Sequence, residues 1–344
     1  MFVNVKKKKI QSTLFVMVRP DGKSSETPMV RYDEYLRLPQ LLQAQQPRTP
    51  CHDETFFIVV HQCFELWFKQ ILLELEAFRT AWQTTLSQDG GEVPLTRLLR
   101  RLDRVDAIFE LMFHHFHVVD KTLEATDFLR FRDAIAPASG FQSVQFRLLE
   151  ARLGLGEAKR VHPARCPRAL DVLSAQDRRR IDAECARESL ADLLKRHLRT
   201  MWAASGCHAW PRTVEAWTRY RQAQALSEDH PLASRWTLLC QQSLAGTDWS
   251  CEELKSALVA LAWGEDGAAA SLSHTRTLLL RLQRLDAHLS EWRTRHSRLV
   301  YRVLGHKTGT GGSAGHGYLH STIKYHTVFS DVALATSLLF PLNT

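Results

Sequence analysis

Residues 51–70 read CHDETFFIVVHQCFELWFKQ, and their apolar side chains recur with the period of a helix. Phe57, His61, Phe64, Phe68 and Leu72 follow one another at spacings of four or three residues. This spacing predicts a helix with one aromatic face, and His61 points inward from that face. An imidazole among aromatic rings needs a hydrogen-bond partner, because burying an unpaired polar group costs about 1–3 kcal/mol. Either the protein core or a ligand supplies that partner.

The composition is that of a globular protein. Its 344 residues are 44% hydrophobic and 24% charged, enough to bury the core of one large domain or two. The net charge is +8, but the arginines are spread along the chain and no zinc-finger or RRM pattern occurs, so we expect no nucleic-acid partner. The apolar piece 14–18 is too short for a signal peptide, and no apolar run approaches a membrane span of about 20 residues. Seven cysteines without a Cys-x-x-Cys pair indicate reduced thiols and a cytoplasmic location.

The remaining patterns predict an all-α fold, a helical bundle. We expect helices over the six segments 32–45, 50 onward with Pro50 at the first helical position, 95–121, 126–135, 142–153 and 271–304. Residues 1–29 are interpreted as an N-terminal tail. Residues 30–154 and 271–344 are expected to form a helical core, and residues 155–270 a smaller helical insertion, which is richer in arginine and in proline and glycine breaks.

The long helix predicted over 271–304 carries a second inward histidine. Leu285, Leu289, Trp292, His296 and Leu299 alternate at spacings of four and three, which is typical of a seam that packs against neighbouring helices. One such histidine alone is typical of a core residue. Two inward histidines on separate helices of an all-α protein favour a pocket for haem or a metal, since bundle interiors hold such groups between facing helices.

Two further patterns suit an amino-acid ligand. Residues 305–315 read GHKTGTGGSAG, a loop whose backbone can approach an anionic group, and Thr310 has a glycine on each side. The alternative for this loop is a surface linker. Phe128 and Arg132 lie four residues apart, so a ring and a guanidinium share one helix face, an arrangement that suits a carboxylate-bearing substrate. The alternative is a surface arginine.

Three motifs together resemble the tryptophan 2,3-dioxygenase family of haem enzymes, which open the indole ring. They are HDE-x-x-FIV-x-HQ-x-x-ELWFK at 52–69, FLRFRDAIAPASGFQS at 128–143, and the block from Trp292-x-x-x-His296 to GTGGSAG at 292–315. The resemblance covers roughly residues 30–155 and 275–343 in the family's order. It implies a haem b cofactor whose iron has His296 as axial ligand, with Ser139, Gly140 and Trp292 lining the haem.

The same resemblance implies the substrate contacts. His61 would be the catalytic residue that meets the indole N–H, Phe57 would pack on the indole, and Arg132 would hold the carboxylate. Thr310 would meet the ammonium and carboxylate groups. Phe128 stands where some members carry a tyrosine that reaches the carboxylate, so we expect binding to depend more on Arg132.

The resemblance also implies a homotetramer, a dimer of dimers. Tyr32 and Tyr35 resemble the N-terminal tyrosines that members insert into a neighbouring subunit's active site. They would therefore be further substrate-binding residues.

The leading hypothesis is a dioxygenase that uses O2 to cleave the indole C2–C3 bond of L-tryptophan, or of a close derivative, giving N-formylkynurenine. One alternative is a mono-oxygenase of the same fold that makes an oxindole from tryptophan or a methylated tryptophan. Another is a haem sensor without turnover, against which Arg132 and the 309–315 loop argue, because a sensor need not recognise a carboxylate. No cysteine follows Cys251, which argues against the related tyrosine hydroxylases.

Overall fold

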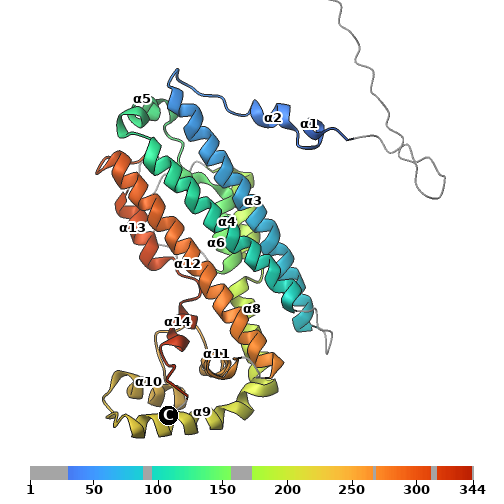
Figure 1. Cartoon of the computed structure of the whole chain (residues 1–344), viewed down its shortest axis with the longest axis vertical. Helices are drawn as coiled ribbons and strands as arrows, with labels where there is room; N and C mark the ends of the chain where they lie inside the picture. Colours follow the sequence, from blue (N-terminus) through green and yellow to red (C-terminus); the bar gives the residue numbers. More distant parts are fainter. Residues whose placement is uncertain (1–29, 88–94, 156–172, 266–268, 311–315, 343–344) are drawn as a thin grey trace, which may run out of the picture. The chain divides into compact units, whose positions relative to one another are not determined.

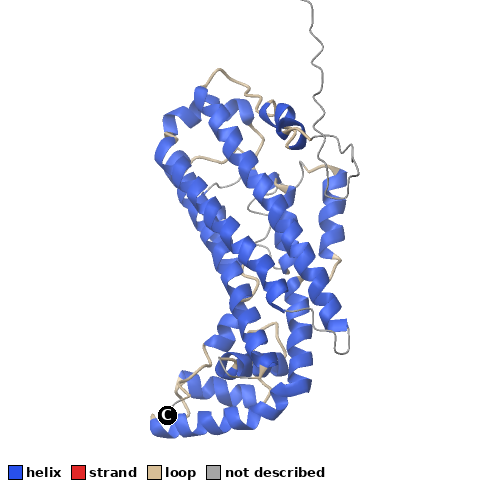
Figure 2. Cartoon of the chain, turned by 45° about the vertical axis from the view of Figure 1, so that its right-hand side comes forward, coloured by secondary structure: helices blue, strands red, loops and turns tan. Residues whose placement is uncertain are grey.

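The computed structural model describes residues 30–87, 95–155, 173–265, 269–310 and 316–342, and in these ranges it contains helices and no strand (Figure 2). The chain divides into an N-terminal unit that ends at Pro47 and a larger unit over 48–344. The predicted all-α class is therefore confirmed for the described part. The tail over 1–29, part of the predicted insertion (156–172) and the end of the glycine-rich loop (311–315) lie outside the described residues.

The N-terminal unit contains two short helices in place of the single helix predicted over 32–45. They are α1 (Tyr32–Tyr35) and α2 (Leu38–Leu42). Between them Arg37 adopts a left-handed backbone conformation, with φ of 53°. The single-helix prediction is wrong because of Pro39, which has no N–H to donate and whose ring would clash with a helical carbonyl four residues earlier.

The larger unit is built around three long helices, α3 (His52–Ser87), α4 (Leu95–Thr122) and α12 (Ala270–Leu304) (Figure 1). The helix α4 packs against both α3 and α12. The shorter helices α5 (Ala125–Ile135), α6 (Val144–Leu153) and α13 (His316–Tyr325) complete this part of the unit. The helices predicted over 95–121, 126–135, 142–153 and 271–304 are thereby confirmed to within two residues at each end.

The remaining helices lie between α6 and α12 in the sequence, except α14, which follows α13. They are α7 (Ala175–Cys185), α8 (Leu190–Met201), a π-helical turn (Trp202–Gly206), α9 (Cys207–Ala223), α10 (Pro231–Cys240), α11 (Cys251–Trp263) and α14 (Ser330–Thr336). The helix α14 packs against α11, and the Trp236 indole donates a hydrogen bond to the Leu338 carbonyl at 2.9 Å. The last residues of the chain therefore contact the predicted insertion. Its boundaries stay a prediction.

The start of α3 lies two residues after the position predicted from Pro50. The Glu54 carboxylate is 1% exposed and accepts hydrogen bonds from the backbone N–H groups of Arg48 and Thr49, at 2.7 and 2.8 Å, and from the Thr49 hydroxyl. These bonds fold residues 48–51 into a loop over the first turn, so Pro50 lies in that loop and the predicted helix start is wrong. Asp53 and Glu54 do lie in the first helical turn, as predicted.

By length and composition, α3 is the one helix among the described residues that is long and apolar enough to cross a membrane. A core helix of a globular protein passes the same test. Ile71, Leu75 and Phe78 of α3 are fully buried in the main hydrophobic core. Only 17% of the apolar window of α3 is buried, so packing within this chain explains part of its apolar character and leaves Val59, Leu66 and Leu73 exposed.

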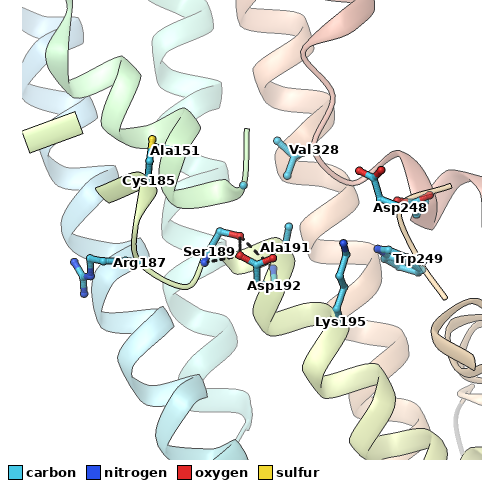
Figure 3. A pocket seen from close by; sticks show the side chains of 12 residues that line it. Ala151, Cys185, Arg187, Ser189, Ala191, Asp192, Lys195, Asp248, Trp249 and Val328 are labelled. Carbon is cyan, nitrogen blue, oxygen red and sulfur yellow. Dashed lines mark hydrogen bonds between the residues drawn. The ribbon is translucent and has the colours of Figure 1, made fainter. Parts of the chain in front are cut away.

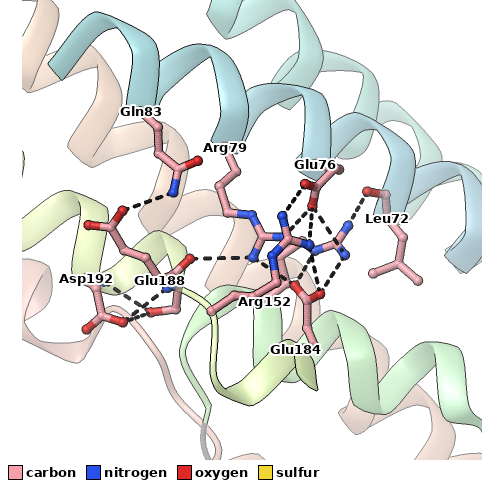
Figure 4. Close-up of polar contacts among 10 residues, drawn as sticks. Leu72, Glu76, Arg79, Gln83, Arg152, Glu184, Glu188 and Asp192 are labelled. Carbon is pink, nitrogen blue, oxygen red and sulfur yellow. Dashed lines mark hydrogen bonds and ion pairs between the residues drawn. The ribbon is translucent and has the colours of Figure 1, made fainter. Parts of the chain in front are cut away.

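A network of buried ion pairs joins α3, α6 and α7 (Figure 4). The Glu184 carboxylate accepts hydrogen bonds from Arg79 at 2.9 Å and from Arg152 at 2.7 and 3.1 Å. Arg152 also donates to the Leu72 carbonyl, and Arg79 pairs with Glu76. Burial would raise the pKa of Glu184, but Arg152 and Arg79 lower this pKa to a value below the ordinary 4.5.

We expect Glu184→Gln to lower the free energy of unfolding by about 3 kcal/mol at pH 7, because Arg79 and Arg152 then keep only the partly exposed carboxylate of Glu76 to balance their buried charges. The folded-state pKa of Glu184 is depressed, so its contribution is present above pH 4.5 and is lost as the pH falls through the lower folded value. Urea unfolding of both proteins between pH 3 and pH 7 measures this difference. A stability difference that does not shrink on acidification would contradict the assignment.

Candidate active site

His61 lies near the start of α3 with its two ring nitrogens in different situations. Its Nδ1 is 2.7 Å from the carbonyl oxygen of Phe57, and the two rings are 4.0 Å apart. A carbonyl oxygen only accepts hydrogen bonds, so Nδ1 carries the proton of the neutral ring and Nε2 is left as an acceptor. Solvent still reaches the His61 side chain, but protein atoms around the ring remove part of its hydration. This desolvation lowers the pKa of His61 below 6.5. His61 is therefore neutral at pH 7.

The aromatic face predicted for residues 57–72 has two parts. From Phe64 onward its side chains are buried in the core, whereas Phe57 is only partly buried and His61 is exposed. The sequence left open whether the protein core or a ligand supplies the hydrogen-bond partner of His61, and the structure supplies one from the protein, the carbonyl of Phe57. The backbone of its own helix satisfies Nδ1, so Nε2 is the nitrogen left for a ligand.

The helix α5 supplies the rings next to Phe57. The Phe57 ring lies 5.5 Å from that of Phe128 and 5.4 Å from that of Phe131. Phe131 is fully buried and belongs to a small apolar cluster with Phe128 and Val303 of α12. The sequence reasoning missed Phe131, although its spacing of three residues from Phe128 puts both on one helix face.

His296 lies on α12 among aromatic side chains. Its ring centroid is 5.2 Å from that of Trp292 and 6.3 Å from that of Phe116 on α4. Phe116 is also 4.9 Å from Phe64 of α3, so this one ring contacts side chains of both long helices. Sequence reasoning missed Phe116, because no spacing in a single helix reveals which partner helix a ring meets.

Ring contacts link the helices that carry the two predicted histidines. Phe64, one turn after His61, lies 6.2 Å from Trp292, which lies 5.2 Å from His296. Burial is the first cause that lowers the pKa of His296, to about 4, and charge repulsion from His61 is the second. Both imidazoles are therefore neutral at pH 7, which is the protonation state that a metal requires of a histidine ligand.

Arg132 and Thr310 join the end of α5 to the loop after α12. The Arg132 guanidinium donates a hydrogen bond to the Thr308 carbonyl, and the Thr310 hydroxyl donates to the Ala138 carbonyl at 2.7 Å. Arg132 retains 19% of its side-chain exposure, and its Nε atom is buried without a hydrogen-bond partner in the described part of the chain. Part of the guanidinium is thus available to a ligand.

Ser139 and Gly140 form the short turn between α5 and α6. The Ser139 hydroxyl accepts a hydrogen bond from the Phe141 N–H at 3.4 Å and so caps the 3-10 turn Gly140–Gln142. A Cβ atom added at Gly140 would meet no atom within 4 Å. The side of Gly140 therefore faces open space.

The predicted substrate residues Tyr32 and Tyr35 lie in the separate N-terminal unit. Their side chains are 74% and 76% exposed. Each is thus available to another molecule, and their role in a neighbouring active site stays a prediction.

A separate cavity of about 280 Å³ lies away from the predicted site residues (Figure 3). It is lined by side chains of α6, α7 and α8 and of the segments before α11 and around α14, among them Ala151, Ser189, Lys195 and Trp249. None of the predicted cofactor or substrate residues lines it.

Comparison with known proteins decides the family. The family model described as tryptophan 2,3-dioxygenase matches residues 19–230 and 247–339. The chain belongs to the tryptophan 2,3-dioxygenase family. The resemblance that the three motifs indicated is confirmed.

Curated relatives from distant organisms carry the name tryptophan 2,3-dioxygenase. The Anopheles gambiae protein is 32% identical to this chain, over 92% of this chain and 87% of its own length. The Bdellovibrio bacteriovorus protein is 31% identical over 91% and 94% of the two chains, and the Dictyostelium discoideum protein is 30% identical over 92% and 85%. The similarity thus extends over nearly the whole chain, including the predicted insertion.

The residues of this site fit the haem that the family implies. Three buried polar atoms of the aromatic cluster around His296 have no hydrogen-bond partner among the described residues: His296 Nδ1, Trp292 Nε1 and His115 Nδ1. Buried polar atoms are rarely left unpaired, so such a group indicates a site that a ligand completes. Partly exposed rings, a neutral histidine and the open side of Gly140 suit a flat, largely apolar group that binds through iron.

We expect His296 to remain neutral to about pH 4 in the haem-free protein, since burial and His61 both disfavour its charged form. In His61→Ala the repulsion is absent, so the pKa of His296 should rise. NMR titration of ¹³Cε1-labelled histidines measures both values. An unperturbed His296 pKa in the wild-type protein would contradict the geometry described above.

Proposed function

We propose that this chain is a haem b enzyme that cleaves the C2–C3 bond of the indole ring of L-tryptophan with O2 and releases N-formylkynurenine. The observation that carries the proposal is the aromatic contact between the helices that bear His61 and His296, where Phe64 of α3 lies 6.2 Å from Trp292 of α12, in a member of this family. The family's relatives are named for this activity.

His296 would hold the haem, and Trp292, Ser139 and Gly140 would border it. Bound haem would supply the redox-active iron that allows O2 to react with the indole. The Nδ1 atom of His296 is buried, so Nε2 would be the nitrogen that meets the iron. Because the low pKa of His296 keeps the ring neutral, no proton has to leave when the iron binds.

His61 would orient the indole. Its Nδ1 proton is committed to the Phe57 carbonyl, so Nε2 is an acceptor and can receive the indole N–H. The Phe57 ring is held by Phe128 and Phe131 and would pack against the indole face. The histidine and the rings would together hold the indole in one orientation. Such positioning would make the reaction of the indole with oxygen effectively intramolecular.

Arg132 and Thr310 would bind the amino-acid part of the substrate. The guanidinium keeps donors beyond the one given to Thr308, and a carboxylate accepts two parallel bonds from such a fork. The Thr310 hydroxyl, bonded to the Ala138 carbonyl, still has lone pairs that can accept from an ammonium group. These contacts support an α-amino acid in preference to a simple indole.

Assembly and location complete the proposal. The tyrosines Tyr32 and Tyr35 would complete a neighbour's active site in a homotetramer built as a dimer of dimers. Exposed apolar residues at intervals of seven on α3, Val59, Leu66 and Leu73, support contacts between copies. The six described cysteines form no disulfide, which supports a reducing, cytoplasmic location.

The mass of the product tests the reaction. Aerobic incubation of the haem-loaded, reduced enzyme with L-tryptophan in ¹⁸O2 should give N-formylkynurenine with both oxygen atoms from O2. An oxindole carrying one labelled oxygen would identify the mono-oxygenase alternative. Haem binding without consumption of tryptophan would instead identify a sensor.

We expect Arg132→Ala to lower kcat/KM for tryptophan by about one to two orders of magnitude, since a charge-assisted contact contributes roughly 1.5–3 kcal/mol. Binding of tryptamine, which lacks the carboxylate, should fall far less. Arg132→Lys should recover only part of the loss, because a point charge cannot reproduce the planar fork. Steady-state kinetics and optical titrations measure these effects. Equal losses for both compounds would mean that Arg132 serves the loop and not the substrate.

A further inference from the structure

A buried carboxylate on α6 binds the turn of α12 next to His296. Glu150 is 1% exposed, and its two oxygens accept hydrogen bonds from different arginines. Arg293 of α12 donates to Oε1 at 3.0 Å, and Arg147 donates to Oε2 at 3.1 Å. Both guanidiniums are themselves almost completely buried. The group therefore depends on Glu150 for its charge balance.

Arg293 makes a second contact that involves another part of the chain. It donates a hydrogen bond to the carbonyl oxygen of His326 at 2.7 Å, and the His326 ring nitrogen lies 3.5 Å from Oε1 of Glu150. His326 is 2% exposed and follows α13 directly. One guanidinium thus ties α12 both to α6 and to the segment between α13 and α14.

Aromatic contacts fix the same turn of α12. Trp292, next to Arg293, is stacked on Phe146 of α6 at 4.7 Å and lies 5.2 Å from the ring of His296. The Arg293 guanidinium lies over the Phe146 ring at 6.0 Å. Residues 293 and 296 are three apart, so they are neighbours on the helix surface. Charge and ring contacts from α6 therefore meet on the turn that carries His296.

A buried ion pair contributes little net stability, because the desolvation of both charges offsets their attraction. A buried ion pair does fix the relative position of the two helices that carry it, since a displacement of either helix would leave a charge buried and unpaired. We infer that Glu150, acting through Arg293, is a positioning residue that holds the His296 turn of α12 in register for the haem iron. This inference rests on the proposed role of His296 as axial ligand.

The test compares Glu150→Gln with Glu184→Gln in the full-length, haem-loaded protein. Both substitutions are nearly isosteric and remove a buried carboxylate that binds arginines, but Glu184 binds Arg79, Arg152 and Arg187, none of which lies on α12. The measurements are the rate of haem transfer to excess apomyoglobin and the iron–histidine stretching band of the ferrous protein by resonance Raman.

Glu150→Gln should release haem about tenfold faster or more, as substitutions behind a metal ligand commonly do, and should shift or broaden the iron–histidine band. Glu184→Gln should lower the unfolding midpoint and leave both haem readouts as in the wild type. Arg293→Lys, which keeps the charge but cannot serve Glu150 and His326 together, is the second variant should Glu150→Gln not fold. It should give an intermediate rate of haem loss.

Equal effects of Glu150→Gln and Glu184→Gln on haem release, or an unchanged band in Glu150→Gln, would overturn the inference. His296→Ala separates this outcome from a failure of the proposed function. If His296→Ala kept the wild-type haem spectrum, the axial assignment itself would be wrong. If it lost the iron–histidine band while Glu150→Gln behaved as Glu184→Gln, only the positioning role would be wrong.

Discussion

The packing of α4 against both α3 and α12 is the constraint on which the site depends. The two histidines lie on α3 and α12, and α4 contacts both helices, so it acts as the spacer between them. Phe116 is the part of the spacer that reaches the site, since its ring contacts Phe64 on one helix and His296 on the other. Trp292 of α12 also contacts Phe64 and Phe68 of α3 directly, at 6.2 and 5.8 Å, so the three helices share one aromatic cluster next to His296.

Around this cluster the protein separates its charged groups from its neutral ones. Desolvation lowers the pKa of both histidines, and His61 lowers that of His296 further, whereas the buried arginines and glutamates are gathered in clusters on α6 and its neighbours. A charge next to an imidazole would change its protonation state near neutral pH. The aromatic layer of Phe146 and Trp292 lies between His296 and the Glu150 cluster in the chain of contacts. The polar scaffold thus supports the site without entering it.

Periodicity predicted the helices over 95–121, 126–135, 142–153 and 271–304, because a helix repeats its contacts within one segment, but His61, which it placed on an inward face, is exposed. The alternation from Leu285 to Leu299 placed His296 on a packed face, and the motif around His61 placed that residue near the start of α3. Pairings between distant segments were not predictable in this way. Glu150 and Arg293 are 143 residues apart, and nothing in either helix alone identifies the other as its partner. The break at Arg37 and the late start of α3 depended on Pro39 and on the Glu54 carboxylate, whose local effects outweigh the apolar pattern.

The two hydrogen bonds between the end of α5 and the loop after α12 have a thermodynamic consequence. One guanidinium donates to the Thr308 carbonyl and, in the role proposed for Arg132, uses its other donors for a carboxylate, so one side chain contacts both the loop and the anion. Linkage then requires reciprocity: whatever free energy the ordered loop adds to the binding of a carboxylate, the carboxylate adds to the order of the loop. Under that proposal, recognition of an amino acid and ordering of the loop at Thr308 are coupled.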